Sequence, residues 1–222
     1  MIIHGGSKWK RRYIQSASIL RDESGMVIVW VLMFMIPVLI MSWIFLSDIT
    51  QAVTDADYNL KDVLDFAVRA ANYQVDDASQ AAKNSKVHAD RAHAAFKNIL
   101  AQVLKLDPVT LAPTQYSPLK EAPRYILIVY NGDNSYSARG CPAGVKYYFN
   151  GTTLSQTSLN ALNFPCTFAI TESDVTQGGS GVATVTMNAP GCVVWIKAKS
   201  RKVIGNDPIE STRWMASEIY YR

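Results

Sequence analysis

Two histidines are the side chains best suited to acid–base or metal chemistry in this sequence. His88 and His93 lie five positions apart. In a helix that spacing is about 500° of rotation, so the two rings lie on different faces. We therefore expect solvated helix residues and no metal pair. Two aspartate pairs could hold a cation but are better explained as a solvated acidic face and a helix cap: Asp55/Asp57 and Asp76/Asp77.

Three cysteines, Cys141, Cys166 and Cys192, fall in the C-terminal half, each beside a proline or glycine. An odd number allows one intramolecular disulfide and leaves one thiol. Cys166–Cys192 is the favoured pair because both border candidate strands, and Cys141–Cys166 is the second choice. A nucleophilic cysteine needs a nearby base, and this half contains no histidine.

Sequence motifs for common catalytic sites are missing. There is no GxGxxG, P-loop, GxSxG or HExxH. The net charge of +4 and the pI near 8.9 are too mild to argue for a nucleic-acid partner, and we expect none. We therefore expect no enzyme, no cofactor and no metal.

The chain must be organised around one apolar run. Met26–Ser47 has no charged residue over 22 positions, which as a helix is about 33 Å, enough to cross a bilayer. Residues 1–25 carry five basic and two acidic side chains, whereas residues 48–77 carry seven aspartates and two basic residues. The asymmetry predicts a single-pass cell-membrane protein with a cytoplasmic N-terminus and an extracytoplasmic C-terminal region. A cleaved signal peptide fits less well, because its apolar run is shorter.

A helical stalk is expected at 48–107, with a break near 75–79. Its first apolar stripe has 4-3-4 spacing, and we interpret it as a packing surface: Ile49, Val53, Ala56, Leu60, Val63, Ala67 and Ala70. The stripe covers either a partner helix or the domain's own sheet. A second stripe runs from Ser85 to Leu106, and Asp76 or Asp77 is the expected cap of the second helix. Asp107-Pro108 is the expected end of that helix.

For the remainder of the chain, residues 108–222, the sequence predicts a mostly antiparallel sheet. Short apolar or alternating runs between turn residues predict strands at 125–130, 145–149, 166–171, 181–187, 193–200 and 213–221. The fold class predicted is α+β: one transmembrane helix at 26–47, a helical stalk, and a β-rich head.

Part of this sequence resembles a known family. Arg21–Ile40, RDESGMVIVWVLMFMIPVLI, looks like the start of TadE/TadG-like pilus-assembly proteins: acidic residues, glycine, an apolar run and P-hydrophobic-L-hydrophobic. Asp48 and Leu60–Ala71 match the acidic and alanine-rich elements that follow, so the resemblance covers about residues 20–75. It implies a pilin-like or accessory component of a tight-adherence (Flp-type) pilus. The implied partners are the lipid bilayer and other pilus or secretion-apparatus proteins.

This resemblance raises the question of processing between Gly25 and Met26. Processed members carry a glutamate five residues after the glycine, where this chain has Trp30. A freed amine at Met26 would lack its acidic partner, so we expect residues 1–25 to be kept. Cleavage would instead make the chain a filament subunit. A different class also stays open: a membrane-anchored extracytoplasmic ligand-binding module unrelated to pili.

Overall fold

The computed structural model describes residues 23–133, 139–171, 174–178, 181, 183–201 and 208–219, without the side chains of 23–25 and 48–59. The chain divides into two compact units, Met1–Gln51 and Ala52–Arg222. Each unit is described by itself below.

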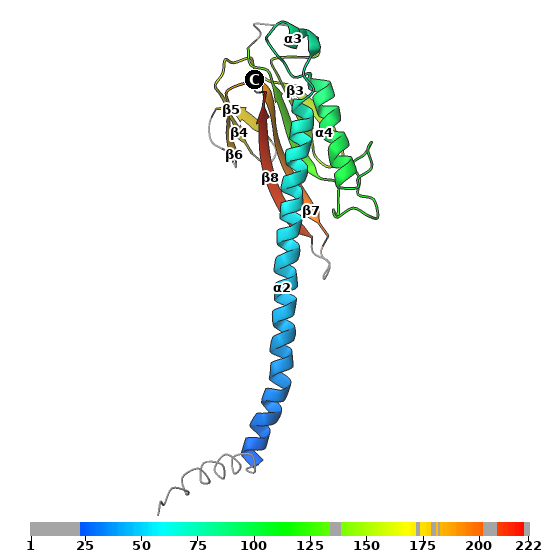
Figure 1. Ribbon diagram of the computed structural model, residues 1–222, viewed down its shortest axis with the longest axis vertical. Helices are drawn as coiled ribbons and strands as arrows, with labels where there is room; N and C mark the ends of the chain where they lie inside the picture. Colours follow the sequence, from blue (N-terminus) through cyan, green and yellow to red (C-terminus); the bar gives the residue numbers. More distant parts are fainter. Residues whose placement is uncertain are drawn as a thin grey trace, which may run out of the picture. The chain divides into compact units, whose positions relative to one another are not determined.

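The longest element is helix α2, Glu23–Asn72, which belongs to both units (Figure 1). Its second half, from Asp48 to Asn72, has no glycine or proline to interrupt it. Pro37 lies inside the helix. The chain then turns, and helix α3, Asp77–Ala81, begins with Asp76 as its N-cap, whose carboxylate accepts a 2.9 Å hydrogen bond from Ser79 N.

Helix α4, Ala89–Val103, is shorter than the second stripe predicts. His88 is its N-cap, and Leu104 is its C-cap. Residues before it are extended, because Val87 forms an antiparallel bridge with Val75. One long second helix is expected from the sequence, but the chain forms two helices, α3 and α4. The extended residue Val87 lies between them and pairs with Val75.

The strands form two antiparallel sheets, of order β3-β2-β1-β7-β8 and β5-β4-β6. This confirms the α+β class with antiparallel sheets. Six of the eight strands overlap predicted ones. β3 and β5 were missed because β3 is polar and exposed throughout and β5 spans 3 residues. The bounds are β1 Arg124–Tyr130, β2 Gly144–Phe149, β3 Leu154–Ser158, β4 Cys166–Ile170, β5 Val175–Gln177, β6 Ala183–Met187, β7 Gly191–Ser200 and β8 Ile209–Glu218.

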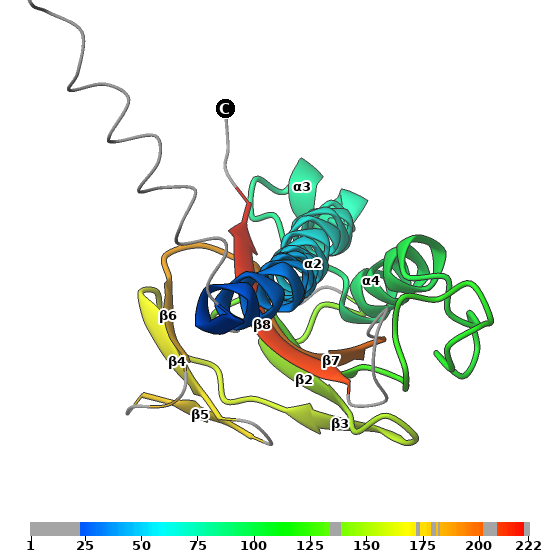
Figure 2. The same ribbon diagram turned by 90° about the horizontal axis from the view of Figure 1, so that it is seen from below.

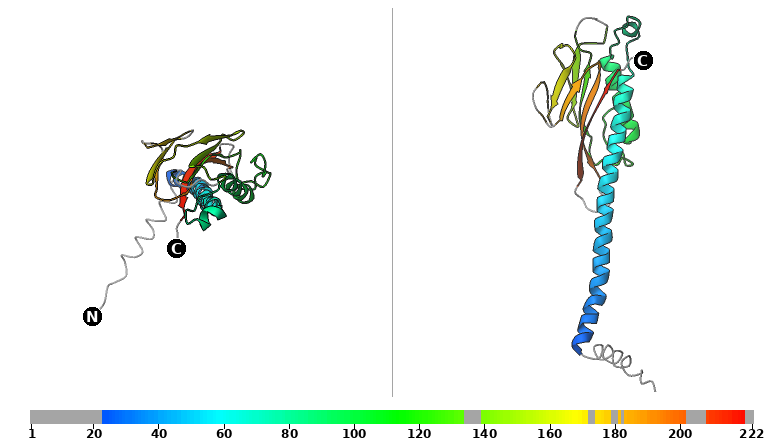
Figure 3. Two further views of the ribbon diagram at one scale, coloured as in Figure 1. Left: turned by 90° about the horizontal axis from the view of Figure 1, so that it is seen from above. Right: turned by 60° about the vertical axis from the view of Figure 1, so that its left-hand side comes forward.

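Two apolar clusters cover opposite faces of the five-stranded sheet. The first contains residues of α2, α4 and alternate residues of β1 and β7, such as Leu127 and Val194. The second contains the other alternate residues, such as Ile128 and Trp195, with β4 and β6. Accordingly, helices α2 and α4 lie on one face of the five-stranded sheet and the three-stranded sheet lies on the other (Figure 2, Figure 3). Strands β1 and β7 are buried on both faces, and this explains their nearly continuous apolar sequences.

The first apolar stripe packs against this unit's own sheet where its side chains are described. Leu60, Val63 and Ala67 are 3%, 4% and 0% exposed and belong to the first cluster. Ala70 is half-buried. The side chains of the remaining members, Ile49, Val53 and Ala56, lie outside the described residues. Of the two interpretations left open, coverage of the domain's own sheet therefore accounts for Leu60, Val63 and Ala67.

Candidate functional site

The first candidate site is the apolar part of α2. Among the described residues, Met26–Ser47 is the one helical segment long and apolar enough to cross a membrane, and none of it is buried in the protein. Large apolar side chains along it, such as Phe34 and Met41, are 68% and 76% exposed. Gly25 and Met26, at the candidate processing position, lie in the first turn of this helix. Monomeric soluble proteins rarely expose a contiguous apolar surface of this size.

The structure contains no disulfide among the three described cysteines. Cys141, Cys166 and Cys192 are all buried free thiols. Cys192 faces the helices in the first apolar cluster, whereas Cys166 belongs to the second cluster. The five-stranded sheet therefore lies between the favoured partners. Strand periodicity locates both cysteines in strands but does not tell which sheet each joins, and this is why the pairing could not be predicted.

Burial also decides the chemistry of these thiols. Desolvation raises the pKa of Cys141 to about 11 and raises the pKa of Cys166 and Cys192 above the ordinary value. A protonated thiol is a poor nucleophile and a poor metal ligand. The three cysteines thus serve as apolar core residues.

His93 is not the solvated residue that its spacing suggests. Its ring stacks on Tyr147 with centroids 4.3 Å apart, and a 2.9 Å hydrogen bond joins its Nε2 to the hydroxyl of Tyr125. Tyr147 in turn donates to Asp90 Oδ1 at 2.9 Å. Desolvation by burial, with a smaller contribution from Lys97, lowers the pKa of His93 to about 4, although Asp90 acts in the opposite direction. The imidazole is neutral at physiological pH.

This burial makes stability depend on pH. The unfolded chain binds a proton at His93 near pH 6.5, but the folded chain does so only near pH 4. The contribution of the neutral His93 to stability is therefore complete above pH 6.5 and is lost as the pH decreases from 6.5 to 4. The difference between the two pKa values corresponds to about 3 kcal/mol, which solvent at the partly exposed ring reduces to about 2 kcal/mol. Urea unfolding at a series of pH values should show this loss.

Two variants isolate the contribution of His93. His93→Phe keeps a flat ring, and His93→Gln keeps a polar group near Tyr125, but neither titrates in this range. Between pH 7 and pH 4, the free energy of unfolding of both variants should fall by about 2 kcal/mol less than that of the wild type. If both variants showed the pH dependence of the wild type, the imidazole of His93 would not be neutral in the folded protein.

A second buried polar cluster joins the start of α4 to the end of β1. The Asn131 side chain accepts a 2.7 Å hydrogen bond from Val87 N and donates to Val87 O and Pro142 O, both at 2.9 Å. Lys86, 3% exposed, donates from Nζ to Asn131 O at 2.7 Å and lies 3.9 Å from the Asp133 carboxylate. Sequence patterns treat lysine and asparagine as surface residues, so this cluster was missed. Its role is to hold loops together.

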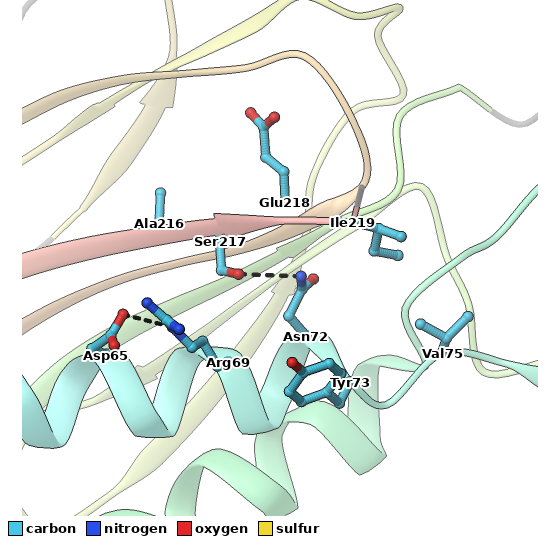
Figure 4. Close-up of a pocket in the computed structure, with 9 residues that line it drawn as sticks. All are labelled: Asp65, Arg69, Asn72, Tyr73, Val75, Ala216, Ser217, Glu218 and Ile219. Atoms are coloured by element: carbon cyan, nitrogen blue, oxygen red, sulfur yellow. Dashed lines mark hydrogen bonds and ion pairs between the residues drawn. The ribbon is translucent and has the colours of Figure 1, made fainter. Parts of the chain in front are cut away.

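The second candidate site is a groove in the Ala52–Arg222 unit, with a volume of about 600 Å³ (Figure 4). One wall is the last turns of α2, and the other is the end of β8. The lining residues are Asp65, Arg69, Asn72, Tyr73, Val75, Ala216, Ser217, Glu218 and Ile219. We call this the α2–β8 groove. Its walls are about 145 residues apart in sequence, and no motif connects them.

Polar groups of the α2–β8 groove are only partly used within the protein. Arg69 Nε pairs with Asp65 Oδ1 at 2.9 Å, and Asn72 Nδ2 donates to Ser217 Oγ at 3.2 Å (Figure 4). Asn72 is 9% exposed, yet its Oδ1 is buried without a hydrogen-bond partner among the described residues. Tyr73 is 81% exposed. A buried amide oxygen without a partner costs free energy unless a ligand or water donates to it.

In the described part of the chain, no three histidine, cysteine or acidic side chains gather as a metal would need. Of the aspartate pairs considered from sequence, Asp76 caps α3, and Asp77 is exposed beside it. The side chains of Asp55 and Asp57 lie outside the described residues.

No family model matches this chain, and neither the curated proteins nor the solved structures contain a match to it. The resemblance of residues 20–75 to TadE/TadG-like proteins therefore stays a prediction.

Proposed function

We propose that this chain is a single-pass component of a tight-adherence (Flp-type) pilus or a related secretion apparatus, with a structural or assembly role. The main support is the unburied apolar segment Met26–Ser47, which continues as α2 into a unit with its own core. Around it lie the acidic-glycine start, the proline and the alanine-rich helix in the order typical of TadE/TadG-like proteins. The proposed partners are the bilayer and other proteins of the apparatus.

A non-enzymatic role agrees with the chemistry of the head. The thiols are buried with raised pKa values, and His93 is neutral and held between two tyrosines. These groups stabilise the core. The contrast between the basic N-terminal tail and the acidic 48–77 segment supports a cytoplasmic N-terminus and an extracytoplasmic head.

Protease added to intact spheroplasts tests this orientation. It should digest residues 48–222 and spare the basic segment Lys8–Arg12, because only the head is outside. After the membrane is permeabilised, both parts should be digested. Protection of the head in intact spheroplasts would contradict the orientation.

Deleting the gene tests the role in the pilus. The deletion strain should lose tight-adherence pili, and the full chain supplied in trans should restore them. N-terminal sequencing of the restored protein should find residues 1–25 still present, which would make it a fixed membrane component. A chain that begins at Met26 would instead make it a filament subunit.

One observation supports the alternative of a membrane-anchored ligand-binding module, namely the α2–β8 groove with its unpartnered Asn72 oxygen. A deletion strain with normal pili would favour this alternative.

A further inference from the structure

We propose that the α2–β8 groove binds an extended segment of a partner protein, which adds to the outer edge of β8 as a further strand. The bound segment would lie between β8 and the last turns of α2. Strand addition of this kind gets affinity from main-chain hydrogen bonds and specificity from alternate side chains. Three features of the groove support it.

The first feature is the free edge of β8. In the described sheet, β8 is the terminal strand and pairs with β7 along its whole length, from Gly191↔Glu218 to Ser200↔Ile209. Edge strands expose a row of backbone donors and acceptors and are commonly protected by charged side chains. Glu210 and Arg213 are charged and lie outside the groove, and Glu218 is charged and lines it. Its neighbours in the groove, Ala216 and Ser217, are small and uncharged, so a backbone can approach the strand there.

The second feature is Asn72. Its amide has one bond, to Ser217, and its other end is buried without a partner among the described residues. Exchanging the amide oxygen and nitrogen would only move the unpartnered atom, because Ser217 can donate or accept. A peptide backbone carries both N–H and C=O groups and can satisfy either orientation. Asn72 thus indicates a ligand with main-chain polar groups.

The third feature is Tyr73, whose exposed ring lies at the rim of the groove (Figure 4). Tyrosine offers a rigid apolar ring with one polar end, which is typical of binding surfaces. A side chain of the added segment that faces α2 can pack beside this ring. The lining stretch Ala216–Ile219, at the end of β8 and just beyond it, matches a segment of about four residues at about 3.4 Å each.

A second copy of this chain fits the groove less well. The β8 edge of a second copy would be flanked by the last turns of that copy's own α2. It would therefore not enter the groove as a single extended strand. The partner segment therefore comes from a different protein.

Selection from a display library of random twelve-residue peptides tests the proposal. The bait is the full-length protein in detergent. Selected peptides should slow hydrogen exchange of backbone amides at 215–218 in β8. They should not protect the opposite edge strand β3, Leu154–Ser158. Peptides that protect only β3, or a library that yields no binder, would overturn the proposal.

Two variants show whether binding uses the groove. Asn72→Leu removes the polar amide, and Tyr73→Ala removes an exposed ring whose loss leaves the core intact. Each should weaken binding of the selected peptides at least tenfold. Asn98→Leu, an exposed asparagine on α4, is the matched control and should bind like the wild type. Equal affinity of the wild type and Tyr73→Ala would overturn the proposal, even if Asn72→Leu failed to fold.

Hydrogen exchange without peptide, at increasing protein concentration, tests whether a second copy of this chain occupies the groove. Concentration-dependent protection of β8 would mean self-association and would overturn the choice of a different protein. The result of the peptide-binding experiment does not depend on the orientation of the protein in the membrane. Peptide binding at β8 with a protease-protected head would support the groove and contradict the proposed function.

Discussion

Replacing Asn131 with alanine should lower the free energy of unfolding of the protein by about 3–5 kcal/mol. The substitution leaves Val87 N, Val87 O and Pro142 O without their partners, and Val87 and Asn131 are 0% and 1% exposed. Each buried group left without a hydrogen bond costs about 1–3 kcal/mol because water does not reach it. Urea unfolding of the full-length protein in detergent measures the change.

Asn150 provides a matched control for this prediction. Its side-chain oxygen accepts three hydrogen bonds, from Thr152 N, Thr152 Oγ1 and Thr153 N, at 2.8–2.9 Å. The residue is exposed, so water can replace these bonds after Asn150→Ala. We expect a loss of about 1 kcal/mol or less for this variant. Similar losses for the two alanine variants would contradict the importance of burial at Asn131.

Replacing Leu60 with aspartate should lower the free energy of unfolding by about 3–5 kcal/mol. Leu60 is 3% exposed and lies in the apolar cluster between α2 and the five-stranded sheet. A carboxylate there has no cationic partner in that cluster, and burying an unpaired charge is strongly unfavourable. Thermal unfolding of the full chain should show a lower midpoint for this variant.

Lys61→Asp introduces the same side chain one position further along the same helix. Lys61 is exposed, so its replacement should change stability by no more than about 0.5 kcal/mol. Equal losses of stability for Leu60→Asp and Lys61→Asp would contradict the orientation of α2 in which Leu60 faces the sheet and Lys61 faces solvent. The pair therefore tests which face of the helix is buried.

Local patterns located most of the strands and one of the helix starts. Tyr125–Tyr130 is apolar between turn residues, and β1 covers it. Asp76 precedes a helix and does cap one. These features depend on neighbouring residues, which a sequence displays directly. Strand β3 has no apolar alternation because it lies at an edge and is exposed throughout, so it left no such pattern.

Contacts between distant residues could not be predicted in the same way. The 4-3-4 stripe showed which face of α2 is apolar, but a sheet and a partner helix bury the same kind of face. Likewise, Asn72 and Ser217 are ordinary polar residues until β8 is placed beside α2. His93 was expected to be solvated because its helix face was judged alone, without the tyrosines of β1 and β2.

The length and continuity of the apolar segment follow from its residues alone, because Met26–Ser47 needs no tertiary contact to be helical and apolar. Sequence patterns also predict six of the eight described strands, but not β3 or β5. By contrast, the positions of Cys166 and Cys192 on opposite faces of a sheet and the groove between α2 and β8 depend on the folded arrangement. Strand order and the packing of one sheet on another are set by the whole core, whereas each local pattern is compatible with several arrangements.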